Sequence, residues 1–148
     1  MRRRRLADVN CSVARALDVV GDPWTLLIVR DLFWGRHRFN EFQDSLGIPR
    51  NTLTARLAAL VDAGVLETRP YQESPPRHEY HLTDKGRALG PVVISLLTWG
   101  DEWSDIGEPP VELVDRSDEH VIDPVMVDRV TDRPVAELQL RPRHRHPA

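Results

Sequence analysis

The stretch from Arg50 to Arg56 concentrates side chains of the types that contact DNA. They are Arg50, Asn51, Thr52, Thr54 and Arg56. Guanidinium groups donate paired hydrogen bonds to phosphates and to guanine, and amide and hydroxyl groups contact phosphates and base edges. Apolar residues recur at helical spacing in the same stretch, at Leu53, Leu57, Leu60 and Val61. The pattern therefore predicts a helix that is buried along one stripe and offers the polar set to DNA on its other faces.

A shorter helix is predicted just before this one. Phe39, Phe42 and Leu46 are spaced as on one face of a helix, and Gly47 follows as a residue that readily ends a helix. Pro49 suits the first turn of the next helix, because the N–H that proline lacks is unpaired there. Two helices joined in this way form the helix-turn-helix pattern, whose second helix enters the major groove of DNA. The pattern also occurs in all-α domains that bind no DNA, so this stretch alone leaves both interpretations open.

The segment after these two helices predicts a wing. Val65–Thr68 is typical of a short strand, residues 69–77 hold three prolines and are expected to form a loop, and His78–Leu82 alternates like a second strand. A hairpin directly after the recognition helix brings its basic residues near the phosphates. The predicted DNA contacts here are Arg69, Arg77 and His78, with Arg38 added from the basic turn that leads into the helix-turn-helix. Exposed hairpins with arginine also occur without nucleic acid, so the prediction depends on where this hairpin lies in the chain.

Further helices are predicted on both sides of this region. Cys11–Val20 is expected to form one helix, and a second, from Asp22 to about Trp34, is apolar nearly all round and is expected to be the buried centre of the domain. Thr83 is expected to cap a long helix from Asp84 to about Trp103. The apolar face of that helix is wider than a small domain needs, which favours a second copy of the chain as its partner; packing against the C-terminal segment is the alternative. The predicted dimer contacts are Leu89, Val93, Leu96, Trp99 and Trp103.

Length and charge predict one domain with an extension. The chain has 148 residues, 41% of them hydrophobic, and a net charge of −3. Residues 1–104 carry a net charge of +1 and residues 105–148 a net charge of −4. We expect a basic arm over residues 1–10, a winged helix-turn-helix domain over 11–104 and an acidic, β-rich extension over 105–148. The fold class expected is α+β, mainly α, and the strands of the extension are expected at Val111–Val114, Val125–Val130 and Pro134–Leu140.

The sequence favours no class of enzyme. It holds no Gly-rich phosphate loop, no residues at metal-ligand spacing and no nucleophile motif, so no catalysis, cofactor or metal is expected. No apolar run is long enough to span a bilayer, and the arginines at the N-terminus are not followed by the apolar stretch of a signal peptide. We therefore expect a cytoplasmic protein.

Several of these motifs, in this order, resemble those of the HxlR-type winged helix-turn-helix regulators, which are transcription factors of the MarR-like group. The matching segments are CSVARALDVVGDPWTLLIVRDLFWG, RFNEFQDSLG, TLTARLAALVDAGVLETR, PPRHEYHLTDKGRAL and WGDEW, within about Cys11 to Trp103. The resemblance implies a homodimer, built from the N-terminal and long C-terminal helices, that binds a pseudo-palindromic operator. It places Arg56 in the LTxRL motif of the recognition helix. The segment after Pro110 lies outside this pattern and has no paired cysteines, so no zinc site is expected.

Cys11 is the only cysteine. It matches a position where some members of the family place a redox-active thiol. A helix N-terminus favours the thiolate, and Arg15 lies one turn on, so an oxidant or electrophile is a candidate signal. Two alternatives stay open: a small buried cysteine without a redox function, and a small-molecule effector held near the dimer helices.

The sequence thus predicts a sequence-specific transcriptional regulator, a homodimeric repressor on double-stranded operator DNA. The alternative is a winged-helix module for protein interaction without specific DNA binding, which the acidic extension would suit. Steep salt dependence of binding to duplex DNA would favour the regulator.

Overall fold

The computed structural model describes residues 5–143 and residue 145. Residues 1–4, 144 and 146–148 lie outside the described residues, and so do three of the four arginines of the predicted basic arm, Arg2, Arg3 and Arg4. The chain divides into two compact units, Met1–Trp103 and Ser104–Ala148, and each is described by itself. The described residues contain no helix long and apolar enough to cross a membrane.

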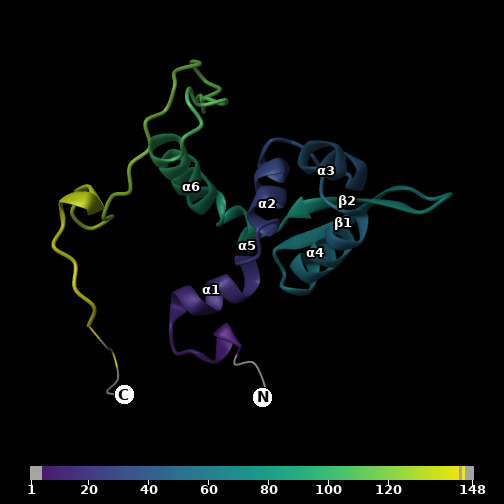
Figure 1. Cartoon of the computed structure of the whole chain (residues 1–148), viewed down its shortest axis with the longest axis horizontal. Coiled ribbons are helices and arrows are strands. Elements are labelled where there is room, and N and C mark those ends of the chain that lie inside the picture. Colours follow the sequence, from purple (N-terminus) through teal and green to yellow (C-terminus); the bar gives the residue numbers. More distant parts are fainter. Residues whose placement is uncertain (1–4, 144, 146–148) are drawn as a thin grey trace. The chain divides into compact units, whose positions relative to one another are not determined.

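Helices and one hairpin make up the first unit (Figure 1). In chain order they are the 3₁₀ helix Leu6–Asp8, α1 (Ser12–Val20), α2 (Thr25–Phe33), α3 (Phe39–Leu46), α4 (Arg50–Asp62), β1 (Leu66–Gln72), β2 (Arg77–Leu82), α5 (Asp84–Arg87) and α6 (Gly90–Trp103). The two strands pair antiparallel and extend beyond the helices as a wing (Figure 1). The prediction of an α+β fold with a helix-turn-helix and a wing is confirmed.

The core lies between α2, α3, α4 and the base of the wing. Its fully buried apolar side chains are Ile28, Val29, Leu32, Phe42, Ile48, Leu53, Leu57, Leu60, Val65 and Leu66. Helix α2 is central, as predicted, because Ile28, Val29 and Leu32 all lie in this cluster. Gly47 ends α3 in the left-handed conformation, with φ of 62°, where an L side chain would be strained. This turn orients α4 relative to α3.

The beginning of α2 differs from its prediction. The helix begins at Thr25 and not at Asp22. The Asp22 carboxylate accepts hydrogen bonds from the backbone N–H groups of Trp24 and Thr25, at 2.9 and 3.2 Å. An aspartate side chain that binds its own backbone two and three residues on stabilises a turn, so residues 22–24 form a turn before the helix.

The wing is longer than predicted. Residues 69–72 and Arg77, which were expected in the loop, continue the two strands, and the turn is confined to residues 73–76. Pro70 is compatible with β1 because each strand of a two-stranded sheet has a free edge, where a missing N–H is tolerated. The register is regular from Leu66 opposite Leu82 to Pro70 opposite His78, and a bulge follows at Tyr71.

The single long helix expected from Asp84 to Trp103 is wrong. It is divided into α5 and α6, with a turn at residues 88–89. Pro91 is the physical reason: it cannot donate a hydrogen bond to the carbonyl of Arg87, and its ring clashes with that carbonyl in a continuous helix. The expected cap is confirmed, since the Thr83 hydroxyl accepts the backbone N–H of Gly86 at 3.2 Å.

The second unit has no extended strand among its described residues, so the prediction of a β-rich extension is wrong there. It holds two isolated antiparallel bridges, Val114 with Val121 and Val127 with Pro134, and the 3₁₀ helix Val135–Glu137. Proline stands directly before the first two expected strands, at Pro110 and Pro124, and begins the third, at Pro134, and a proline cannot donate a hydrogen bond to a neighbouring strand. Most of the apolar side chains of this unit are exposed: Ile106, Val111, Val114, Val121, Val125, Met126, Val127, Val130 and Leu140.

Candidate nucleic-acid interface

An open groove of about 720 Å³ runs between the N-terminal ends of α3 and α4 and the wing. It brings together predicted DNA contacts that are distant in sequence. Its lining residues are Arg38, Phe39, Asn40, Glu41, Arg50, Tyr71, Arg77, His78 and Tyr80. Four of the nine predicted DNA contacts, Arg38, Arg50, Arg77 and His78, therefore share one surface. We call this surface the groove.

Arg38 is held by both strands of the wing. Its Nε donates to Glu79 Oε1 at 3.0 Å, and its Cζ lies 4.1 Å from the centre of the Tyr71 ring. The hydrogen bond from Arg38, followed by one from His81, holds the pKa of Glu79 below its ordinary value. The guanidinium is thus fixed in orientation, while its side chain stays half exposed.

Arg50 stands at the beginning of α4. Its Cζ lies 5.0 Å from the centre of the Phe39 ring, a cation–π contact that leaves the guanidinium exposed. The exposed side of α4 continues through Asn51, Thr54, Ala55 and Ala58, while Thr52 is half-buried. The Thr54 hydroxyl donates to the Arg50 carbonyl at 3.0 Å and keeps its lone pairs for an outside donor.

Arg56 lies apart from the groove. Its Nη1 is 3.5 Å from Asp22 Oδ2, and its side chain is 40% exposed. Asp22 is the residue whose carboxylate also caps the turn before α2. Arg56 therefore connects α4 to the turn before α2, and Asp22 engages its Nη1.

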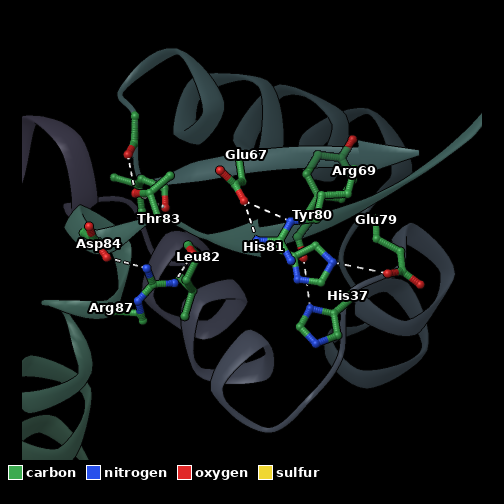
Figure 2. Close-up of polar contacts among 12 residues, drawn as sticks. His37, Glu67, Arg69, Glu79, Tyr80, His81, Leu82, Thr83, Asp84 and Arg87 are labelled. Atoms are coloured by element: carbon green, nitrogen blue, oxygen red, sulfur yellow. Dashed lines mark hydrogen bonds and ion pairs between the residues drawn. The ribbon is translucent and has the colours of Figure 1, made fainter. Parts of the chain in front are cut away.

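The three predicted DNA contacts of the wing, Arg69, Arg77 and His78, differ in whether another side chain of the chain engages them. Arg69 is paired with Glu67 on the same strand, as Figure 2 shows. The distance from Arg69 Nη2 to Glu67 Oε1 is 2.6 Å. Arg77 and His78 are exposed and line the groove. Among the described residues, no ion pair or side-chain hydrogen bond involves Arg77, so its guanidinium is available to an anion.

Two stacked histidines join the wing to the loop before α3 (Figure 2). The rings of His37 and His81 are 4.3 Å apart with an angle of 18° between their planes. His37 Nδ1 donates to the Tyr80 carbonyl at 3.0 Å, and the backbone N–H of Tyr80 donates to the His37 carbonyl at 2.8 Å. His81 Nε2 donates to Glu79 at 3.2 Å. The wing is therefore attached to the helix-turn-helix through these contacts as well as through β1.

Sequence reasoning missed five of the groove residues, Phe39, Asn40, Glu41, Tyr71 and Tyr80. Tyr71 lies at the bulge of β1, which redirects its side chain. The prolines on either side led us to expect a loop there, and periodicity gives no sign of a bulge. Asn40 follows directly after Phe39 at the beginning of α3, and its polar type was the available signal.

Comparison with known proteins agrees with this geometry. A family model described as HxlR-like helix-turn-helix matches residues 19–108. The chain belongs to this family. Its members are helix-turn-helix transcriptional regulators.

This HxlR-like chain is 48% identical over 103 residues to the uncharacterized HTH-type transcriptional regulator Rv3095 of Mycobacterium tuberculosis. The match covers 69% of the chain and 65% of that relative, just under two thirds of its length. The crystal structure of PA1607 has 41% identity and a TM-score of 0.80, and the match covers 91% of the chain and 96% of PA1607. The redox regulator HypR, in its reduced form, has 34% identity and a TM-score of 0.61 over 65% of the chain and 96% of HypR.

The HxlR-like chain carries an exposed apolar stripe on α6. Val92, Leu96, Trp99 and Trp103 are 42 to 68% exposed and follow one another at three- and four-residue spacing, as on one face of a helix. We call these four residues the α6 stripe. Of the predicted dimer contacts, the structure places Leu96, Trp99 and Trp103 in it, whereas Leu89 and Val93 pack against the core of the same chain.

A second apolar face, on α1, lies beside Cys11 in sequence. Val13 is 66% and Leu17 47% exposed. Cys11 itself is exposed and takes the N-cap position of α1, so it is not buried within its own chain as one alternative expected.

Proposed function

We propose that this chain is a transcriptional regulator that binds double-stranded DNA through α4 and the wing. The observation that supports this proposal best is the groove, in which Arg38, Arg50 and Arg77 converge from three elements on one exposed surface. Guanidinium groups gathered on one exposed surface suit the phosphates and guanines of a major groove entered by α4. Asn51 and Thr54 are the candidate base contacts, because amide and hydroxyl groups read base edges.

The regulator is proposed to act as a homodimer on a pseudo-palindromic operator. The α6 stripe and the exposed face of α1 support this, since apolar side chains in such number are normally covered by a partner. Two recognition helices related by a two-fold axis would contact half-sites one helical turn of DNA apart. Occupation of a promoter by this dimer gives a repressor, acting in the cytoplasm, where a prokaryotic chromosome lies.

A signal is proposed to act through the dimer. Cys11 supports a redox signal, because it is exposed and lies beside the apolar face of α1, and because the similar protein HypR is a redox regulator. A small molecule bound near the dimer helices is the other candidate. Either would change the spacing of the two recognition helices and so the affinity for operator DNA.

Selection of binding sequences from random duplex DNA tests the proposal. The purified chain is used with and without reductant, and the selected duplex is then titrated with salt. A two-fold symmetric site with a steep salt slope is expected. A redox difference that is absent in Cys11→Ser would identify the thiol as the sensor. If no sequence is enriched and binding stays weak at low salt, the DNA-binding proposal fails and the protein-interaction module is favoured.

A further inference from the structure

Arg38 lies where three elements meet. Its backbone stands immediately before α3, and its N–H donates to Glu41 Oε2 at 2.8 Å. Its guanidinium reaches β2 through Glu79 and β1 through Tyr71. A long arginine side chain normally has many rotamers in water, and ordering it costs conformational entropy. The contacts with Glu79 and Tyr71 already restrict the rotamers of Arg38 in the protein without DNA, so less conformational entropy is lost when DNA binds.

The geometry leaves the outer edge of the guanidinium available. Nε is used by Glu79, at 3.0 Å, and the Tyr71 ring covers one face at 4.1 Å. No described residue makes an ion pair with Nη1 or Nη2 of Arg38. These two nitrogens form the fork that binds phosphate or guanine with two parallel hydrogen bonds.

Glu79 lies next to Arg38, beside the surface proposed to bind the polyanion DNA. A free carboxylate there would repel phosphate. Glu79 is not free, however: Oε1 accepts from Arg38 and Oε2 from His81, which is stacked on His37. The Glu79 carboxylate is therefore fixed in position. A residue that orients the Arg38 guanidinium must itself be fixed in this way.

Tyr71 reaches Arg38 because of the bulge in β1. The register shifts between Pro70 and Gln72, so Tyr71 has no partner on β2. A bulge redirects a side chain that would otherwise follow the alternation of the strand. The ring is 38% exposed, although an apolar ring gains from burial, which fits a ring that serves as a platform for the cation.

We propose that Tyr71 and Glu79 are positioning residues that hold Arg38 as a preorganised contact for one base pair of the operator. The inference rests on the proposed DNA-binding function and deepens it. Preorganisation strengthens binding only where the partner fits the fixed geometry. Tyr71 and Glu79 therefore set the affinity for the selected operator and not the affinity for DNA in general.

The test compares full-length variants on two duplexes of equal length, the selected operator and an unrelated sequence. Glu79→Gln should weaken operator binding about tenfold, as expected for loss of one well-oriented contact, and should leave binding to the unrelated duplex unchanged or slightly tighter. Arg38→Ala should weaken operator binding at least as much. The double variant Arg38→Ala, Glu79→Gln should bind the operator no more weakly than Arg38→Ala alone, because Glu79 acts through Arg38.

Tyr71 supplies a matched pair of variants. Tyr71→Phe keeps the ring and should bind the operator like the original chain, whereas Tyr71→Leu should lose affinity for the operator and not for the unrelated duplex. Circular dichroism and the thermal midpoint of each variant exclude loss of fold.

Opposite results would overturn the inference. If Glu79→Gln tightens binding to both duplexes alike, Glu79 is only a repulsive charge. If the losses for Arg38→Ala and Glu79→Gln add, or if Tyr71→Leu binds like Tyr71→Phe, the two residues do not act through Arg38. Failure of the original chain to enrich any operator would instead overturn the proposed function, and this inference with it.

Discussion

The groove and the α6 stripe are both exposed surfaces of the first unit, but their exposure means different things. In the groove, arginines stay hydrated, and Arg38 has a carboxylate beside it. In the α6 stripe, Leu96, Trp99 and Trp103 are 49 to 68% exposed, and their apolar surface gains no free energy from contact with water. A charged side chain is well solvated in water, so its exposure has little effect on the free energy. Burial of apolar area is favourable by about 25 cal/mol per Å², and exposed tryptophans do not gain this free energy. The groove takes its lining residues from one chain, whereas the exposed apolar area of the stripe supports the proposed dimer.

The largest effect is expected from a charge in the α6 stripe. Leu96→Glu should convert a dimer to a monomer and weaken operator binding about a hundredfold or more, because two linked half-sites become one. Sedimentation and binding titrations measure the two effects. Thr98→Glu adds the same charge to a half-buried position of the same helix that is at neither three- nor four-residue spacing from the stripe, and should leave both unchanged. A dimer that survives Leu96→Glu would show that this stripe is not the interface.

The second-largest effect on operator affinity is expected to differ between Arg77, which no described residue pairs, and Arg69, which is paired. Arg77→Ala should weaken operator binding about tenfold and lower the salt slope by about one counterion contact per subunit, since none of the described residues pairs with its guanidinium. Arg69→Ala serves as the control on the neighbouring strand and should have a smaller effect, because Arg69 is already paired with Glu67. Equal effects of the two changes would mean that DNA separates Arg69 from Glu67.

Arg56 provides the third comparison. Arg56→Ala should weaken operator binding by a factor of only about three and lower the free energy of unfolding by less than about 1 kcal/mol, since its ion pair with Asp22 is partly exposed. DNA titration and urea unfolding report the two quantities. A loss of affinity as large as that of Arg77→Ala would mean that Arg56 leaves Asp22 and contacts DNA directly, as the resemblance implied.

The smallest effect is expected on the free energy of unfolding at acidic pH. Hydrogen bonds from the backbone N–H groups of His37 and Arg38 hold the pKa of Glu41 below its ordinary value of 4.5. A carboxylate with a lowered pKa stabilises the folded chain above pH 4.5, and this contribution is lost as the pH falls through the folded-state pKa. The free energy of unfolding should therefore decline less in Glu41→Gln than in the original chain between about pH 6 and about pH 3.5. Urea unfolding measures this, and parallel curves would contradict it.

Most of the helix-turn-helix could be predicted from the sequence, because local signals suffice there. Phe39, Phe42 and Leu46 mark one helix, Gly47 its end and Pro49 the entry to the next, and each acts within a few residues of itself. The same local reasoning failed at the wing and after Thr83. In those places pairing across the sheet extended the strands through Pro70, and the ring of Pro91 divided a continuous apolar pattern into α5 and α6.

The sequence by itself determined which side chains could contact DNA, because residue type decides what a group can donate and at what charge. Only the tertiary structure decided which of them act together. It joined Arg38 to Glu79 and Tyr71 across more than thirty positions of sequence and moved Arg56 to Asp22. It also assigned Leu89 and Val93 to the core and Leu96, Trp99 and Trp103 to the surface. The physical reason is that apolar periodicity marks a face of a helix, but the packing of neighbouring elements decides how much of that face is covered.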